Sequence, residues 1–225
     1  GDQQAALAGQ LCIEETMGKC TYGTGAFLLV NTGSKIIQTS QNLLTTVAWS
    51  NRGKHTYALE AASFIAGSAI NFLKQNLGIT KDSYDLNISS SVTAAPEIYF
   101  VPALLGLGSP WWEPSVRGSI FGLNLQTTKE QIILATLEGI SLQVEDLLTT
   151  IKDSYTNIKE LHVDGGVSKN NSLIKFQSFI SQINIYRSKN TEATALGAAY
   201  MAALSCNIYK NISDLRNIHK NSEVF

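Results

Sequence analysis

The sequence is poor in cysteine, in net charge and in long apolar runs, and each shortage excludes a class of protein. Its three cysteines, Cys12, Cys20 and Cys206, form no CxxC pair and are odd in number. They argue against a disulfide framework or a zinc site and favour reduced thiols in a cytoplasmic protein. A formal net charge of -1 gives no basic surface for nucleic acid. No apolar run approaches the roughly 20 residues that cross a bilayer, so we expect no membrane segment.

The first residues also lack the features of a native protein N-terminus. The opening GDQQAALAGQ has no initiator methionine and no basic and apolar segments of a signal peptide. We therefore expect the chain to be an excised fragment or a processed product. Its 225 residues, 44% of them hydrophobic, are enough for a sizeable core in one domain or two small ones.

Strand and turn signals dominate the first third of the sequence. After Asp2, which is typical of a helix N-cap, a short helix of small residues is expected. Two strands between Thr21 and Thr32 enclose a Gly-Thr-Gly turn, and further strands of an antiparallel meander are predicted at 35–39, 43–49 and 55–59.

A helix is predicted over 60–75, with Gly67 in its middle. Glycine there costs about 1 kcal/mol relative to alanine, so we expect another part of the chain to approach that backbone. The polar segment 83–95 predicts a surface excursion, and a strand is expected at 98–101. The long Gly/Pro/Trp-rich loop that follows is of a length that usually indicates function or an interface.

The second half alternates between helix and strand patterns. Thr127 and Glu130 are typical of a capping box, and apolar residues then recur with a 3.6-residue period up to Ile151. Strands and helices are predicted in turn at 158–163, 170–182, 183–187 and 194–204. The pattern is β-α-β-α, which predicts a sheet covered by helices.

Two glycine-rich turns are candidates for ligand binding. In Gly23-Thr24-Gly25 the glycines allow close backbone approach, and the N–H groups could form a nest for a phosphate. A plain hairpin turn is the more common meaning of such a corner. Asp164-Gly165-Gly166 follows a strand and leads into a helix, a place where ligands gather in α/β sheets, yet it matches neither a P-loop nor a GxGxxG fingerprint. The alternative is an ordinary turn in which Asp164 caps the backbone.

The ordered run of motifs resembles one known family. GDQQAALAGQ, TYGTGAFLLVNTG, LLTTVAW, YALE, YFVPALLGLGSPWWEPSVRGSIFGL, VDGG and TALGAAYMAAL follow one another as in the glycerol kinases. These enzymes belong to the FGGY carbohydrate kinases of the actin-like (ribonuclease H-like) ATPase superfamily. The resemblance extends from Gly1 to about Asn207 and is to the C-terminal domain.

The resemblance implies a fold and an activity. The fold would be a ribonuclease H-like α/β domain, with a mixed sheet, an antiparallel meander and flanking helices. Residues 1–225 would form the nucleotide-binding half of a kinase whose N-terminal domain is absent from this chain. The parent enzyme would use ATP and Mg²⁺ to convert glycerol to sn-glycerol 3-phosphate in the cytoplasm, and homo-oligomers are common in the family. The isolated chain would be inactive.

Carried over residue by residue, the resemblance assigns the substrate side of the site. Asp2 matches the general base that accepts the proton of the attacking hydroxyl, and Gln3 matches a substrate-binding glutamine. Phe27 matches an aromatic residue that packs on the glycerol carbons. Without the resemblance, Asp2 could be merely an N-cap and Phe27 merely a core residue.

The nucleotide side is assigned in the same way. Thr24, with Gly23 and Gly25 shaping its turn, matches the contact to the phosphates. The other matching nucleotide contacts are Gly67, Asn71, Gly166 and Asn170. Asn71 is a departure, because glutamine is usual there, and so are Ala62 and the segment Val167-Ser168-Lys169.

Three functions therefore stay open at this point. The first is a glycerol kinase, and the second is another FGGY kinase acting on a different polyol or ketose. The third is a non-catalytic module that binds nucleotide or other chains. The adjacent Trp111 and Trp112 could form a recognition surface or could pack the loop, and His55, His162 and His219 show no metal-ligand spacing.

Overall fold

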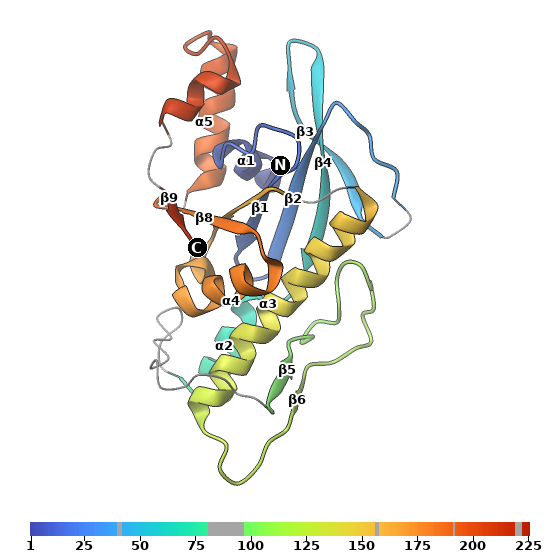
Figure 1. The fold of residues 1–225 in the computed structure, drawn as a ribbon, viewed down its shortest axis with the longest axis vertical. Helices are drawn as coiled ribbons and strands as arrows, with labels where there is room; N and C mark the ends of the chain where they lie inside the picture. The colour runs from blue at the N-terminus through green and yellow to red at the C-terminus, as the bar shows by residue number, and fades with distance from the viewer. Residues whose placement is uncertain (40–41, 81–96, 156–157, 191, 219–221) are drawn as a thin grey trace.

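The computed structural model describes residues 1–39, 42–80, 97–155, 158–190, 192–218 and 222–225. Its centre is a seven-stranded sheet with the strand order β3-β4-β2-β1-β7-β8-β9 (Figure 1). In that order the strands are Leu44–Asn51, Lys54–Ser63, Ala26–Gly33, Met17–Tyr22, Glu160–Asp164, Asn184–Ser188 and Ser222–Val224. Strands β1, β7 and β8 run parallel to one another, and the other neighbours pair antiparallel.

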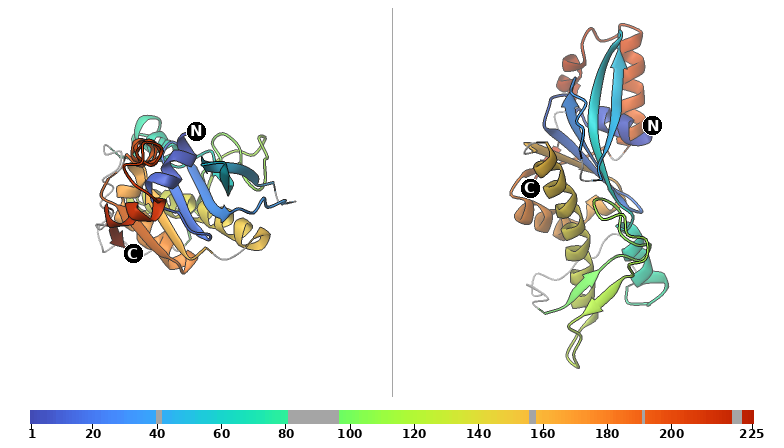
Figure 2. Two further views of the ribbon diagram at one scale, coloured as in Figure 1. Left: turned by 90° about the horizontal axis from the view of Figure 1, so that it is seen from above. Right: turned by 90° about the vertical axis from the view of Figure 1, so that its right-hand side faces the viewer.

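Helices cover both faces of the sheet (Figure 2). On one face α1 (Asp2–Gly9) packs against α5 (Ala193–Ser205). On the other lie α2 (Gly67–Gln75), the long α3 (Lys129–Ser154) and α4 (Asn171–Ser181). The short hairpin of β5 (Tyr99–Val101) and β6 (Ser119–Phe121) packs against α3, and two short 3₁₀ segments are η1 (Gly166–Lys169) and η2 (Ile212–Ile218).

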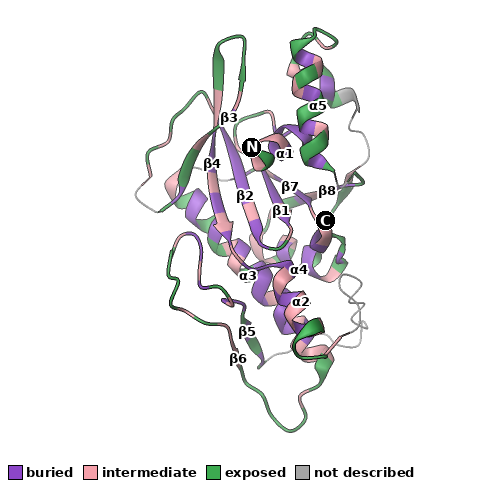
Figure 3. Ribbon diagram, turned by 180° about the vertical axis from the view of Figure 1, so that it is seen from behind, coloured by how far each residue is buried: buried purple, intermediate pink, exposed green. Residues whose placement is uncertain are grey.

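Alternation along the central strands separates the two faces. In β1, Cys20 and Tyr22 are buried in the large core between the sheet, α3 and α4. The intervening residues Lys19 and Thr21 point to the opposite face, as expected from the period of two in a strand. That face has a smaller apolar cluster around Leu7 of α1. Buried residues accordingly run along the central strands and the inner side of α3 (Figure 3). This arrangement confirms the mixed sheet with an antiparallel meander and flanking helices.

Three local predictions were wrong. Residues 35–39 form no strand, and 60–63 belong to β4 instead of a helix. Strand β4 is hydrogen-bonded on both sides, to β2 and β3, and this pairing overrides the helical preference of its Ala and Glu residues. The capping box is formed by Thr128 and Gln131, while Thr127 accepts a hydrogen bond from the backbone of Asn124. The predicted excursion at 83–95 lies outside the described residues.

Two expectations from composition can be compared with the structure. Cys12, Cys20 and Cys206 are all free thiols, the first two buried and the third exposed. Within the described part of the chain, no helix has both the length and the apolar character needed to span a membrane.

Candidate functional site

The Gly23-Thr24-Gly25 turn connects β1 to β2 as predicted. The Gly23 N–H donates to the Gly25 carbonyl at 2.9 Å, which closes the turn, and Thr24 is exposed. Directly before it, Tyr22 is fully buried and its hydroxyl donates to Oε1 of Gln177 on α4 at 3.1 Å. Desolvation by burial raises the pKa of Tyr22 well above its ordinary value. The turn is therefore anchored in the core below and open to solvent at Thr24.

The first turn of α2 rests on this corner. The Gly67 N–H donates to the Gly23 carbonyl at 2.9 Å, and the Thr24 carbonyl accepts from the N–H of Ala66 at 2.8 Å and of Ser68 at 3.1 Å. A Cβ on Gly67 would lie 2.6 Å from the Gly23 carbonyl oxygen. The expected backbone approach at Gly67 is thus confirmed. Its placement in the middle of a helix was wrong, because α2 begins at Gly67.

The Asp164-Gly165-Gly166 turn lies beside the same corner. Strands β1 and β7 are parallel with Thr21 opposite Asp164, so their carboxyl ends reach the same edge of the sheet. Gly165 has φ +87°, and a Cβ there would lie 2.4 Å from the Tyr22 carbonyl oxygen, so only glycine fits. Gly166 begins η1, and Val167 approaches Gly67 from this side. Three turns distant in sequence therefore meet, and such an edge is where α/β sheets bind ligands.

Asn170 and Asn71 flank this meeting point. Asn170 is buried, and its Oδ1 accepts from the Leu173 N–H at 2.9 Å, which makes it the N-cap of α4. Asn71 is partly exposed on α2, one turn after Gly67. Lys169 is exposed, as expected for a solvated side chain. The nucleotide contacts assigned to Asn71, Gly166 and Asn170 stay predictions.

Helix α1 presents Asp2 at its first position. The cap residue is Gly1, with no side-chain capping bond, so the alternative in which Asp2 merely caps the helix was wrong. The Asp2 carboxylate is exposed, and Gln3 is partly buried. Oε1 of Gln3 accepts a hydrogen bond from Nζ of Lys19 on β1. An exposed carboxylate next to an anchored amide is suited to accept a proton from a bound hydroxyl group.

Phe27 lies on the same face of the sheet as Lys19. It is paired with Thr21 of β1 and with Ala62 of β4, and its side chain is partly exposed instead of belonging to the buried core. Because Phe27 is only partly buried, core packing does not by itself explain the aromatic side chain at this position. Its position stays compatible with the predicted contact to a small apolar surface.

Helix α1 packs closely against α5. A Cβ on Gly9 would lie 1.9 Å from the Ala193 carbonyl oxygen, and one on Gly197 would lie 1.7 Å from the Ala5 carbonyl oxygen. The Thr194 hydroxyl donates to the Asp2 carbonyl at 3.4 Å. The two helices thus touch backbone to backbone, which fixes the distance of α1 from its neighbour.

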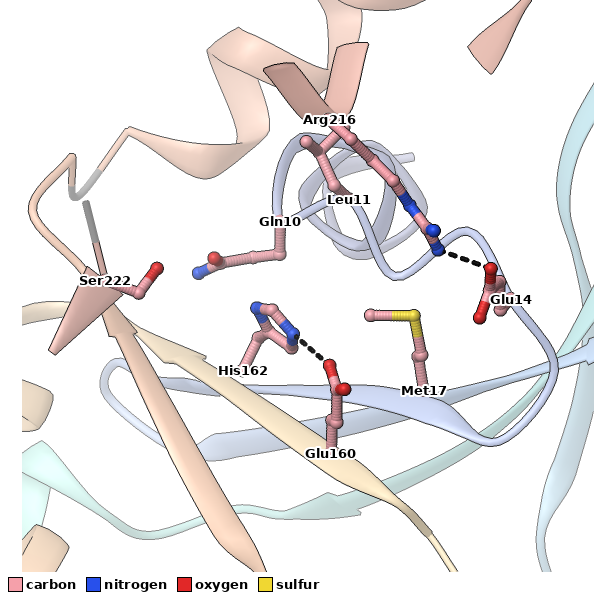
Figure 4. A pocket seen from close by; sticks show the side chains of 8 residues that line it. All are labelled: Gln10, Leu11, Glu14, Met17, Glu160, His162, Arg216 and Ser222. Carbon is pink, nitrogen blue, oxygen red and sulfur yellow. Dashed lines mark hydrogen bonds and ion pairs between the residues drawn. The ribbon is translucent and has the colours of Figure 1, made fainter. Parts of the chain in front are cut away.

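A separate cavity of about 260 Å³ lies at the other end of α1 (Figure 4). None of the predicted site residues lines it. Arg216 and Glu14 form an ion pair at 2.6 Å, and His162 lies 3.4 Å from Glu160 of the same strand. No described group of three or more His, Cys, Asp and Glu side chains could hold a metal ion, here or elsewhere in the described ranges.

The loop tryptophans pack within the chain. Nε1 of Trp112 donates to the Asn42 carbonyl at 2.7 Å, and its ring meets Phe64 edge-on. Trp111 is largely exposed. Of the two alternatives for this pair, packing of the loop is the one that the contacts of Trp112 support.

Residues 18–206 match the model of the FGGY family of carbohydrate kinases, C-terminal domain. The chain belongs to this family. The match includes the Gly23-Thr24-Gly25 turn, the start of α2 and the Asp164-Gly165-Gly166 turn, which are the three segments that meet at the sheet edge. It begins after Asp2 and Gln3.

Curated relatives match nearly the whole length of this FGGY-family chain. It is 48% identical over 219 residues to the glycerol kinase of Bacillus subtilis, covering 96% of this chain and 44% of that protein. It is 47% identical over 218 residues to the glycerol kinase of Listeria monocytogenes, with the same two shares. The FGGY-family chain therefore spans less than half the length of the relatives it matches.

Solved structures agree with the fold of the FGGY family. Plasmodium falciparum glycerol kinase, solved with ADP, superimposes with a TM-score of 0.92 and 35% identity over all of this chain and 46% of that one. The xylulose kinase of Lactobacillus acidophilus has a TM-score of 0.84 at 20% identity, covering 98% of this chain and 45% of that one. The predicted carbohydrate-kinase fold of the actin-like superfamily is confirmed.

Sequence reasoning missed the polar contacts beneath α1. Lys19 was not singled out, although a lysine within the alternating strand MGKCTY is a visible signal. Capping of the turn by Asp164 was one of two alternatives; Asp164 is buried, and its Oδ2 accepts from Nε2 of Gln10 at 3.1 Å. The pairing of Gln3 with Lys19 and of Gln10 with Asp164 depends on the packing of α1, which no local pattern indicates.

Proposed function

We propose that residues 1–225 form the nucleotide-binding C-terminal half of a glycerol kinase. The parent enzyme would transfer the γ-phosphoryl group of ATP to glycerol, giving sn-glycerol 3-phosphate and ADP. The observation that carries the proposal is the position of β1. Its Lys19 contacts Gln3 of the helix that starts at Asp2, and its carboxyl end leads into the turn that exposes Thr24.

The proposed roles follow from the chemistry of phosphoryl transfer, which needs positioning and charge stabilisation. Asp2 accepts the proton of the attacking hydroxyl group, and Gln3 and Phe27 hold the glycerol. Thr24 and the N–H groups of its turn contact the phosphates and stabilise charge on their oxygens. Gly67, Asn71, Gly166 and Asn170 border the nucleotide.

Mg²⁺ would be required with ATP. Among the described residues, no group of three His, Cys, Asp or Glu side chains could hold the ion. Mg²⁺ commonly keeps several waters and binds through substrate phosphates and one or two carboxylates. When bound, it would neutralise charge between the β- and γ-phosphates, and Asp2 is the exposed carboxylate on the substrate side.

The proposal includes an N-terminal domain outside this chain, because the chain covers only 44% of the Bacillus subtilis glycerol kinase. That domain would supply the remaining phosphate and glycerol contacts. The active site would then lie between the two domains. We therefore expect no ATP-dependent phosphorylation of glycerol by the 225-residue chain alone. We expect the enzyme to be cytoplasmic.

The full-length protein tests this function directly. Its kcat/KM would be measured with glycerol, dihydroxyacetone and xylulose by coupling ADP formation to NADH oxidation. The proposal expects glycerol to be preferred, with the product accepted by a dehydrogenase specific for sn-glycerol 3-phosphate. A clear preference for xylulose would instead favour another FGGY kinase. Absence of phosphorylation of any polyol or ketose would favour a non-catalytic module.

A further inference from the structure

Lys19 is a fully buried lysine in the middle of β1. Lysine is almost never fully buried unless it is paired. Its Nζ donates to Oε1 of Gln3 and, at 2.9 Å, to Oγ1 of Thr21. Desolvation lowers the pKa of Lys19, while the nearby Asp164 carboxylate acts in the opposite direction. A buried lysine at this position indicates a specific role for its charge. Its side-chain partner on α1 is Gln3, the predicted substrate-binding glutamine.

Acidic groups on both sides of Lys19 complete a polar layer between the sheet and α1. Asp164 on β7 is buried, with Oδ1 unpartnered and Oδ2 bound to Gln10. Glu60 on β4 is half-buried; desolvation raises its pKa, and the charge of Lys19 opposes that shift. Gln4 donates to Glu60 at 3.5 Å. Three glutamines of α1 and its C-cap thus reach charged groups of the sheet.

Helix α1 buries few large apolar side chains. Its buried residues are Ala6, Leu7, Ala8 and Gly9, of which only Leu7 is large. The contact with α5 at Gly9 and Gly197 brings the backbones of the two helices close together. The Gln3 side chain itself is held by its bond to Lys19.

The bond also decides which end of the Gln3 amide faces outward. Glutamine has an acceptor oxygen and a donor NH₂ group. Because Lys19 occupies the oxygen, the NH₂ group is left to face the open side. The attacking hydroxyl group donates its one proton to Asp2 and can offer only lone pairs to Gln3. A donor is then the group that this hydroxyl requires.

We propose that Lys19 is a positioning residue that orients the Gln3 amide as a hydrogen-bond donor to the substrate hydroxyl group. The proposal rests on the proposed function. Lys19 itself does not touch the substrate, since it is buried behind Gln3. The neighbouring Asp164 and Glu60 carboxylates compensate the buried charge and leave the oxygen of Gln3 as its acceptor on α1.

The test uses Lys19→Met in the full-length protein, with Lys175→Met on the exposed side of α4 as the matched control. Loss of a hydrogen bond to a charged group predicts a rise in KM for glycerol of about 10-fold or more. KM for ATP should change less than about 2-fold, because the side-chain hydrogen bonds of Lys19 go to Gln3 and Thr21 and to none of the three turns of the nucleotide side. Unchanged KM for glycerol, or a parallel rise of both KM values, would overturn the proposal.

Gln3→Glu is the second variant and decides the matter if Lys19→Met does not fold. A glutamate stays paired with Lys19 but has no N–H to offer, and it adds a carboxylate beside Asp2. KM for glycerol should again rise about 10-fold with an unchanged unfolding temperature. An unchanged KM for glycerol in this variant would overturn the proposal. A wild-type protein that phosphorylates no glycerol would instead refute the proposed function itself.

Discussion

At the first position of α1, Asp2 has an exposed carboxylate without a capping bond. Asp2→Asn in the full-length protein should therefore leave folding unchanged while removing the proton acceptor. General-base catalysis contributes about 10²–10⁴-fold, so kcat should fall by that factor. Steady-state rates and thermal unfolding measure the two effects. Asp153→Asn, on the exposed side of α3, is the control, and normal turnover by the Asp2 variant would show that Asp2 is not the general base.

The three thiols should differ sharply in reactivity. Burial raises the pKa of Cys20 to about 12 and that of Cys12 well above its ordinary value. Because the thiolate is the reactive form, iodoacetamide should modify the exposed Cys206 at pH 8 and spare the two buried residues. Mass spectrometry of peptides from the native full-length protein measures each site. All three should react in denaturant, and rapid native labelling of Cys20 would show that β1 is not buried in this way.

Where α2 begins, glycine is required by the approach of another backbone. Gly67→Ala would place a methyl group 2.6 Å from the Gly23 carbonyl oxygen, so the Gly23-Thr24-Gly25 turn or the helix must move. Overpacking of this kind costs about 1–3 kcal/mol of stability. We expect a similar loss in ADP binding, about tenfold in Kd for each 1.4 kcal/mol.

Gly23→Ala is the control in the same turn, since its methyl group would meet nothing closer than 3.9 Å. Titration calorimetry with ADP and urea unfolding of the full-length protein compare the two variants. Equal effects of the two substitutions would mean that the contact between α2 and the turn is unimportant.

The elements differed in how far local sequence could predict them. The turn between β1 and β2 was predictable because glycines and alternating residues act locally. The extent of β4 was not, because its pairing on both sides involves β2 and β3. Strand β9 pairs with β8 at the sheet edge, across a large separation in sequence, and was missed for the same reason.

The residues of the candidate site also fall into two groups, those that local sequence could predict and those that it could not. The glycine corners at Gly23 and Gly165 have local signatures, and the family motifs added Asp2 and Thr24. The bond between Gln3 and Lys19 joins a helix to a strand that only the folded packing brings together. Its partners were therefore recognisable only as separate polar residues, one at a helix start and one in a strand.

For the whole molecule, the central claim is that three distant turns form one nucleotide site at the carboxyl edge of β1 and β7. Parallel pairing of these strands puts their ends together, and the start of α2 closes the group from the side. Nucleotide binding should therefore slow amide exchange in all three turns together. The cavity near η2, which none of the three turns lines, should not respond.

Amide hydrogen exchange of the full-length protein, with and without Mg²⁺ and ADP, tests this claim most directly. The account predicts slower exchange on ADP binding in three segments together, 22–26, 66–71 and 165–170, with no change at 212–218. Saturating nucleotide that leaves all three segments unchanged, or that protects 212–218 instead, would contradict the claim.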